Sequence, residues 1–234
     1  ETWNHWTYDR DRNVNAWVAS NQIIWHELPQ HGVIRRLKSR DGWSQRWLTF
    51  MKAPMENITI NVDKSPNFDS IPTAQDLQLV GHTSSHIQSG GSSKAYELLH
   101  SFLNTRGQHY TKAMSSPVTA YTACSRLSPH IAFGSVSIRE IYNIFEKYQK
   151  KHQQSPKSDL KKNWTQAFKS FSGRLRWHCH FIQKLEDDPS IEFQALHSHY
   201  RSIEKDLNQD FFNAWKNGCT GFPMIDACMR ALKE

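Results

Sequence analysis

The chain has 234 residues, of which 38% are hydrophobic and 22% charged, and its formal net charge at pH 7 is +7. A chain of this length can bury a substantial core as one large domain or two small ones. No run of 18 apolar residues and no leader-like start are present, so we predict neither a membrane span nor a secretory signal. The positive charge favours a nucleic acid or another polyanion as partner. The four cysteines are typical of free thiols in a cytoplasmic protein.

The first residues of the chain predict a helix followed by a short strand. The helix covers residues 1–22 and is expected to bury three apolar side chains, Val14, Trp17 and Val18. The strand is Ile23-Ile24-Trp25, an apolar run that ends before Pro29. A helix that leads into a strand is one unit of an α/β sheet.

Residues 33–50 combine five basic residues with Trp43 and Trp47. Basic residues among aromatic ones can contact the phosphates and bases of a nucleic acid. Trp43, Trp47 and Phe50 also fall on one face of an amphipathic helix, and this is the interpretation that we favour.

The apolar pattern fades between residues 51 and 93, where Pro, Asn, Asp and a Ser-Gly-Gly-Ser-Ser run predict an interdomain linker. Helices are predicted over residues 94–106, from Ser137 to about 151, and over residues 159–186. The last of these carries an apolar stripe at steps of three and four, Leu160, Trp164, Phe168, Phe171, Leu175, Cys179 and Ile182. With two further helices near residues 210–216 and from Pro223, the second domain reads as all-helical.

A loop rich in hydroxyl side chains opens the segment Ser115–Tyr142. Its hydroxyls and backbone N–H groups can point at one anion, helped by the positive N-terminus of the helix that Ser137 and Glu140 cap. Arg126 adds a fixed positive charge or forms an internal salt bridge. From the residues alone, the simpler interpretation is a connection whose Ser and Thr side chains only cap helices.

His178, Cys179 and His180 are candidate metal ligands by residue type. Neighbouring residues on a helix point in different directions, so one ion cannot easily bind all three. Zinc ligands usually come as spaced pairs, and we predict no metal site here.

Three blocks resemble one family. Cys124-Ser125-Arg126-Leu127-Ser128-Pro129, followed by Phe133-Gly134, is similar to the Thr-Ser-Arg-Leu-Ser-Pro…Phe-Gly segment of the photolyase/cryptochrome family, and Trp177–Phe181 and Trp215–Leu232 match in the same order. The resemblance implies a mainly α fold, a helical FAD-binding domain preceded by a helix–strand remnant of an α/β (Rossmann-like) domain. It implies a remnant over residues 1–50, a linker over 51–93 and an incomplete FAD-binding domain over 94–234. Because the chain begins with Glu1 and stops inside a helix, we expect a segment of a longer protein.

The resemblance also implies the site. The implied cofactor-binding residues are Tyr110, Cys124, Ser125, Arg126, Leu127, Ser128 and His178. Tyr110 is equally well explained as a core tyrosine. Arg174 and Trp177, in a block similar to the family's Glu-Leu-x-Trp-Arg, are the implied DNA contacts, and no catalytic side chain is assigned. Arg174 stands where the family has the Glu that accepts hydrogen bonds from a pyrimidine dimer, and a guanidinium only donates.

The first implied function is that of a DNA photolyase (deoxyribodipyrimidine photo-lyase), in which reduced FAD passes an electron to a pyrimidine dimer in light. One alternative is a cryptochrome-type blue-light photoreceptor that signals to a partner protein, and Arg174 favours it. The other is an inactive truncated segment. The family's flavin-ring residues lie beyond this stretch, so we expect the isolated chain, a cytoplasmic monomer, to bind FAD weakly or not at all. An antenna chromophore would belong to the missing N-terminal domain.

Overall fold

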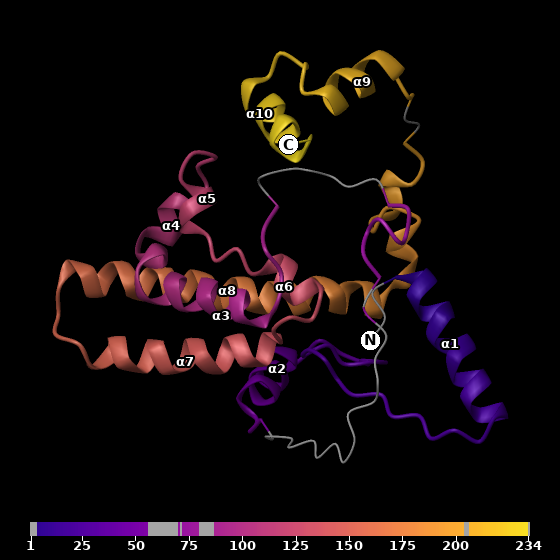
Figure 1. Cartoon of the computed structure of the whole chain (residues 1–234), viewed down its shortest axis with the longest axis horizontal. Coiled ribbons are helices and arrows are strands. Elements are labelled where there is room, and N and C mark those ends of the chain that lie inside the picture. Colours follow the sequence, from indigo (N-terminus) through magenta and orange to yellow (C-terminus); the bar gives the residue numbers. More distant parts are fainter. Residues whose placement is uncertain (1–3, 56–69, 71, 80–86, 204–205, 234) are drawn as a thin grey trace. The chain divides into compact units, whose positions relative to one another are not determined.

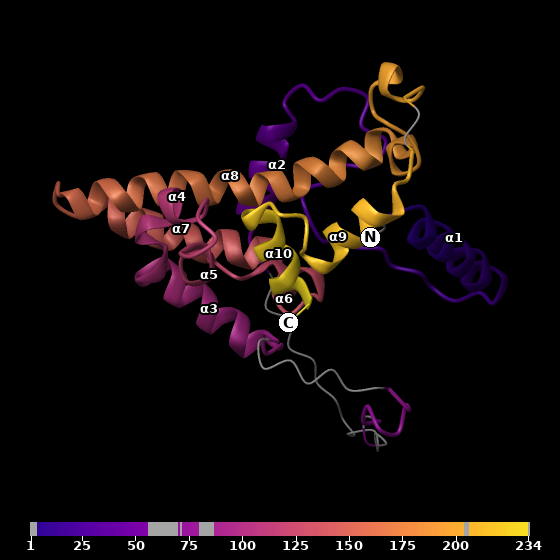
Figure 2. The same ribbon diagram turned by 90° about the horizontal axis from the view of Figure 1, so that it is seen from above.

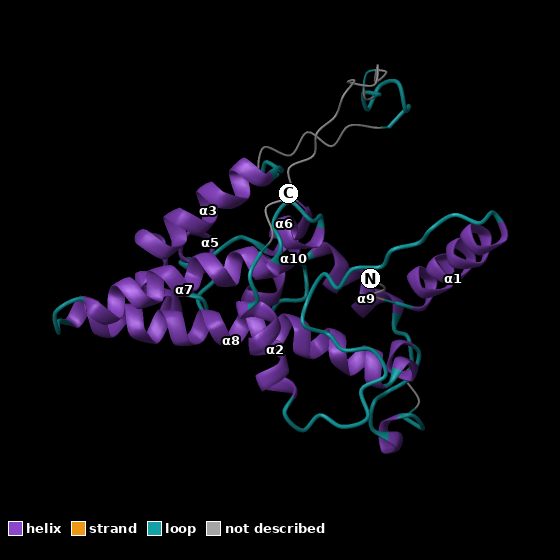
Figure 3. Ribbon diagram, turned by 90° about the horizontal axis from the view of Figure 1, so that it is seen from below, coloured by secondary structure: helices purple, strands orange, loops and turns teal. Residues whose placement is uncertain are grey.

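The structure, a computed structural model, describes residues 4–55, 70, 72–79, 87–203 and 206–233. In this part of the chain all regular secondary structure is helical, which confirms the predicted fold class (Figure 3). The chain divides into two compact units, residues 1–53 with 90–209 and residues 54–89 with 210–234, and each is described separately. About half of the predicted linker lies outside the described residues, and the domain boundaries remain a prediction. None of the described helices has the length and apolarity needed to cross a membrane.

Three helices form the body of the first unit: α3 (Ser92–Asn104), α7 (Ile138–Gln154) and α8 (Asp159–Asp187). α7 and α8 lie side by side, α3 contacts α7 at an oblique angle, and α2 (Trp43–Lys52) packs against α7 (Figures 1 and 2). Four short helices join α3 to α7: η1 (Arg106–His109), α4 (Tyr110–Ala113), α5 (Ala120–Ala123) and α6 (Ser128–Ala132). After α8 the chain forms two short turns, η2 (Pro189–Glu192) and η3 (Ser198–Tyr200).

Local signals explain the bounds of the long helices. The Ser137–Glu140 capping box that starts α7 is present, and the side chain of Ser158 caps α8. The stripe of α8 is buried at its five middle positions, Trp164, Phe168, Phe171, Leu175 and Cys179. Leu160, at the end of the stripe, is exposed.

The N-terminal helix is confirmed, but the strand that was predicted to follow it is wrong. α1 covers His5–Ser20, and residues 23–30 have no regular structure. A strand needs a partner for its N–H and C=O groups, and no strand lies in the described part of the chain. The expected burial of Trp17 is also wrong, since 59% of its surface is exposed and Val18 alone on this helix is buried.

The amphipathic helix expected within residues 33–50 forms only from Trp43 onwards, as α2. Its buried face is Trp43, Trp47 and Met51, one position beyond the predicted Phe50. Trp47 is fully buried and lies against the backbone of Gly32, where a Cβ atom would come 2.3 Å from its Cδ1 atom. The segment before α2 is therefore packed tightly onto this indole.

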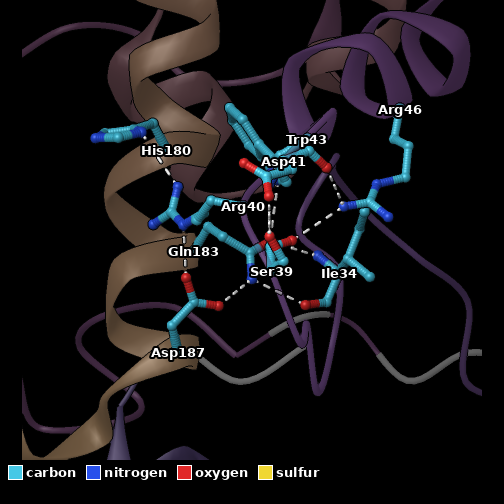
Figure 4. A network of polar contacts seen from close by, with 9 residues as sticks. All are labelled: Ile34, Ser39, Arg40, Asp41, Trp43, Arg46, His180, Gln183 and Asp187. Carbon is cyan, nitrogen blue, oxygen red and sulfur yellow. Dashed lines mark hydrogen bonds and ion pairs between the residues drawn. The ribbon is translucent and has the colours of Figure 1, made fainter.

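A buried glutamine of α8 holds the same N-terminal segment (Figure 4). Gln183 Oε1 accepts hydrogen bonds from Ile34 N (2.7 Å) and Trp43 Nε1 (3.1 Å). Its Nε2 donates to Ile34 O (2.9 Å) and to Asp187 Oδ1 (2.7 Å), and Arg40 Nε donates to the other oxygen of Asp187 (2.6 Å). All four hydrogen-bonding positions of the amide are used, so Gln183 joins residues 34–43 to α8.

The second unit contains α9 (Gln209–Asn217) and α10 (Pro223–Lys233), joined by a tight turn. The Asp226 carboxylate accepts hydrogen bonds from Thr220 N and Oγ1 (both 2.7 Å) and from Gly221 N (3.0 Å). The hydrogen bonds from Thr220 lower the pKa of Asp226. Arg230 Nη1 donates to Gly218 O (2.9 Å), so the side chains of Asp226 and Arg230 both hold the turn.

Candidate cofactor site

One arginine, Arg106, holds the loop between α4 and α6 through hydrogen bonds to its backbone. The Arg106 guanidinium donates to four backbone carbonyl oxygens and one hydroxyl, namely Leu98 O (3.0 Å), Thr122 O (2.8 Å), Cys124 O (2.6 Å), Ser125 O (3.3 Å) and Ser101 Oγ (2.8 Å). In a trans peptide the C=O and N–H groups point in opposite directions. Since the carbonyls of Cys124 and Ser125 face Arg106, the N–H groups of Ser125 and Arg126 face away from it.

The next two residues continue this arrangement. Arg126 is in the left-handed region (φ 63°), and Leu127 returns to the right-handed helical region (φ −90°, ψ −12°). This alternation turns successive N–H groups toward one concave side, which is an anion-binding geometry. The buried side chain of Leu127 anchors the loop in the core, whereas Ser125 is half-buried and Ser128 exposed.

Positive charge gathers around Cys124. Burial raises the pKa of its thiol, and the charges of Arg126, Arg106 and Arg174 act against that rise. The three guanidinium groups therefore lie close enough to this position to affect its ionisation. Arg126 also stacks over the Tyr121 ring, with its Cζ atom 4.3 Å from the ring centroid.

Tyr110 is a core residue that also borders the loop. Its ring packs edge-on against Phe102 (5.3 Å between centroids) and Phe171 (6.4 Å). Burial is the main cause that raises the pKa of its hydroxyl, with smaller effects from Cys124 and Arg174. The two interpretations of this tyrosine are thus compatible.

Arg174 and Trp177 are two residues of α8 that lie next to the loop. Arg174 Nη2 lies 3.8 Å from Met114 Sδ, at the start of the loop, and its Cζ atom lies 4.5 Å from the centroid of Trp177. The Trp177 ring is 51% exposed. The structure therefore groups Tyr110, the residues 124–128 and Arg174, with the Trp177 indole presented beside them.

His178 has a different environment. It packs against His31, with the ring centroids 6.2 Å apart, and lines a small cavity with Ile131, Val136 and Ser137. Burial, with a smaller effect of His31, lowers its pKa from 6.5 to about 4. At neutral pH this side chain is uncharged, so it does not supply the positive charge of the Arg that the resemblance leads one to expect at this position.

The low pKa of His178 predicts a dependence of stability on pH. Between pH 6.5 and 4 the unfolded chain takes up a proton at this position before the folded chain does. The contribution is fully present above pH 6.5 and is lost toward pH 4, by up to about 3 kcal/mol. Urea unfolding at several pH values measures it. His178→Gln should flatten this part of the profile, whereas the same change at the exposed His109 should not; equal profiles for wild type and His178→Gln would contradict the assignment.

Two residues of this region carried no recognisable sequence signal. Arg106 follows a helix and lies in no motif, and Met114 precedes the loop without any pattern. The contacts that bring them to the loop and to α8 join residues 16 to 60 positions apart.

Comparison with known proteins supports one family. Residues 171–234 match the family described as the FAD binding domain of DNA photolyase. A deoxyribodipyrimidine photo-lyase of Streptomyces griseus is 30% identical over 177 residues, which are 74% of this chain and 33% of that protein. Cryptochrome-2 of Arabidopsis thaliana is 30% identical over 144 residues, or 62% of this chain and 22% of that protein.

The fold has a solved counterpart. A class III photolyase from Agrobacterium tumefaciens aligns with a TM-score of 0.73 at 17% identity, covering 99% of this chain and 49% of that one. The chain thus spans about a third of the length of the Streptomyces relative and about half of the solved chain. The family match, these relatives and the motifs in the loop and in α8 agree, and the chain belongs to the photolyase/cryptochrome family.

Proposed function

We propose that this chain is part of a photolyase/cryptochrome-like flavoprotein and that the loop Cys124–Ser128 binds the phosphates of FAD. The observation that supports this most is the way Arg106 turns two loop carbonyls inward and so leaves the adjoining N–H groups facing outward. The left-handed Arg126 then adds a concave run of donors beside a fixed positive charge.

The chemistry of the donor set fits a pyrophosphate. Residues 105–128 contain no Asp or Glu, so the loop brings only cations and neutral donors to the ligand. The hydroxyls of Ser125 and Ser128 form no hydrogen bond with any described residue, and both can donate to phosphate oxygens. Charge-assisted bonds of this kind are the stronger ones in proteins.

The remaining site residues have supporting roles in this proposal. The buried side chain of Leu127 anchors the loop in the core, and Tyr110 and Cys124 would support it from the protein side. His178, which the resemblance implies as a cofactor residue, is neutral and would add no charge to the site. FAD, when bound, supplies the absorption of light and the transferable electron. Trp177 offers a stacking surface to a base of DNA, and Arg174 holds that indole in place and donates to acceptor groups.

Light-driven repair of pyrimidine dimers in DNA is the first candidate for the activity of the flavoprotein. The net charge of +7 is suited to a DNA partner. A photoreceptor without repair activity is the second candidate, and Arg174 favours it. Its guanidinium cannot accept hydrogen bonds from the N–H groups of a base, as a carboxylate at this position would.

An FAD titration of the 234-residue chain, followed by flavin fluorescence, tests the phosphate site. We expect weak binding that Arg126→Gln and the double change Ser125→Ala/Ser128→Ala each reduce about tenfold, since each removes one or two charge-assisted bonds. Arg36→Gln is the matched control, because Arg36 is an exposed arginine that also has a positive φ (53°). Equal effects of the loop variants and the control would contradict the assignment.

An assay on a longer protein that contains this chain distinguishes repair from photoreception. It is purified in the dark, mixed with dimer-containing DNA and exposed to blue light with a reductant. Loss of dimers supports a photolyase. Flavin photoreduction without loss of dimers supports a photoreceptor, and a protein that takes up no flavin contradicts both.

A further inference from the structure

Two hollows adjoin along one side of α8. The first, of about 430 Å³, lies at the start of the helix and is lined by Lys157, Ser158, Lys161, Lys162, Thr165 and Gln166. The second, of about 400 Å³, is lined by Gln166, Lys169, Arg174 and Trp177, together with Thr111 of α4. Gln166 borders both, so they form one surface feature, which we call the α8 groove.

The spacing of these residues gives the groove its length and direction. Lys162 and Trp177 are 15 positions apart on α8, which spans roughly 22 Å at 1.5 Å per residue. At 100° per residue, Lys162 and Gln166 fall within about 60° of the direction of Trp177. The groove therefore leads from the exposed indole toward the connection between α7 and α8.

The lining of the groove is cationic. It includes four lysines and Arg174, and among the side chains that the structure describes no acidic residue lines either hollow. Some lysines outside the groove are paired with a carboxylate, as Lys52 and Lys150 are with Glu146 at 3.0 and 3.1 Å. Lys162 and Lys169 are exposed and form no ion pair with any described carboxylate.

One of the lysines is already held in place. Lys161 Nζ donates to Gln153 O (2.7 Å) and to Ser155 O, which ties the end of α7 to the first turn of α8. Ser158 Oγ accepts from Lys161 N at 3.1 Å. These bonds fix the wall of the first hollow, so a ligand would meet an ordered cationic surface.

We propose that the α8 groove binds the phosphodiester backbone of a nucleic-acid strand that runs from Trp177 toward the α7–α8 connection. Cations spread over roughly 22 Å match a chain of phosphates, which are about 3.4 Å apart along one DNA strand, better than a single compact anion. An exposed aromatic ring at one end of a basic groove is the arrangement that single strands use for stacking. The proposal rests on the proposed function in taking DNA as the partner, and it adds the course of the strand away from the candidate cofactor site.

The test is the salt dependence of DNA binding by the 234-residue chain. The probe is a fluorescent oligothymidine of about twelve nucleotides, within the site sizes typical of single-strand binders. The double variant Lys162→Gln/Lys169→Gln should lose two phosphate contacts. The magnitude of the negative slope of log K against log salt should then be smaller than in the wild type by roughly 1.4. Lys147→Gln/Lys151→Gln removes the same charge from exposed lysines of α7 that line neither hollow, and it should leave the slope within about 0.3 of the wild type.

Each outcome decides the proposal. A reduced slope in the groove variant alone supports it, whereas equal slopes in both double variants, or no change in either, would overturn it. Flavin fluorescence of the same samples keeps the two proposals apart. A groove effect in samples where the loop variants Arg126→Gln and Ser125→Ala/Ser128→Ala bind FAD as well as the control Arg36→Gln would contradict the phosphate site and leave the groove standing. Loss of FAD affinity in the loop variants without a groove effect would overturn the groove and leave the phosphate site standing.

Discussion

Replacing Gln183 with leucine should lower the free energy of unfolding of the first unit by about 3–5 kcal/mol. The amide is fully buried and is the hydrogen-bond partner of Ile34 N, Ile34 O and Trp43 Nε1 (Figure 4). Leucine fills much the same space but cannot bond, so three polar groups lose their partner at once. Each unsatisfied buried group costs about 1–3 kcal/mol, and the sum is reduced where water reaches the site.

Urea unfolding followed by circular dichroism measures this loss. Gln166→Leu is the matched control, because Gln166 lies on the same helix with its side chain exposed, and it should change stability by less than about 0.5 kcal/mol. The role given to Gln183 would be refuted by equal midpoints for the two variants. Such a result would mean that residues 34–43 are held by the packing of Trp43 and Trp47 alone.

Replacing Arg106 with methionine should both destabilise the fold and abolish the anion-binding shape of the loop. The guanidinium makes five hydrogen bonds, four of them to backbone carbonyls. Methionine keeps much of the volume but leaves those carbonyls without their donor, for an expected loss of about 2–4 kcal/mol. With Cys124 and Ser125 free to turn, the adjoining N–H groups no longer face one side.

Two measurements on the same variant test this account. The free energy of unfolding should fall, and FAD affinity should fall by more than about tenfold, as expected for losing several positioned donors. Arg126→Gln, which removes charge from the loop but not its support, should reduce FAD affinity with little change in stability. Arg201→Met is the control for deleting an arginine, since among the described residues the Arg201 guanidinium donates one hydrogen bond, to Ala195 O. An Arg106→Met variant that is destabilised but binds FAD normally would refute the link between the support and the site.

Much of this protein could be predicted from the sequence because helix signals are local. The apolar steps of α3 and α8, the capping box of Ser137 and Glu140, and the stop at Asp188-Pro189 act over four residues or fewer, and the structure places these helix ends within two residues of the prediction. The motif Cys124–Ser128 likewise indicated the family before any geometry was known. Local pattern was misleading where a segment depends on partners, as in residues 23–25, which have no strand beside them in the described part of the chain, and in the exposed Trp17.

Only the tertiary structure decided how the candidate site is built. Arg106 reaches carbonyls up to 19 positions ahead, Arg174 meets Met114 across 60 positions, and Gln183 binds Ile34 across 149. The pattern of apolar residues in the sequence does not predict such contacts, because they form when buried polar groups find partners in the packed chain. The sequence by itself determined the helices, the family and the residue types of the loop. Packing determined which side chains surround Cys124, why His178 is neutral, and that the lysines of α8 form one continuous groove with Trp177.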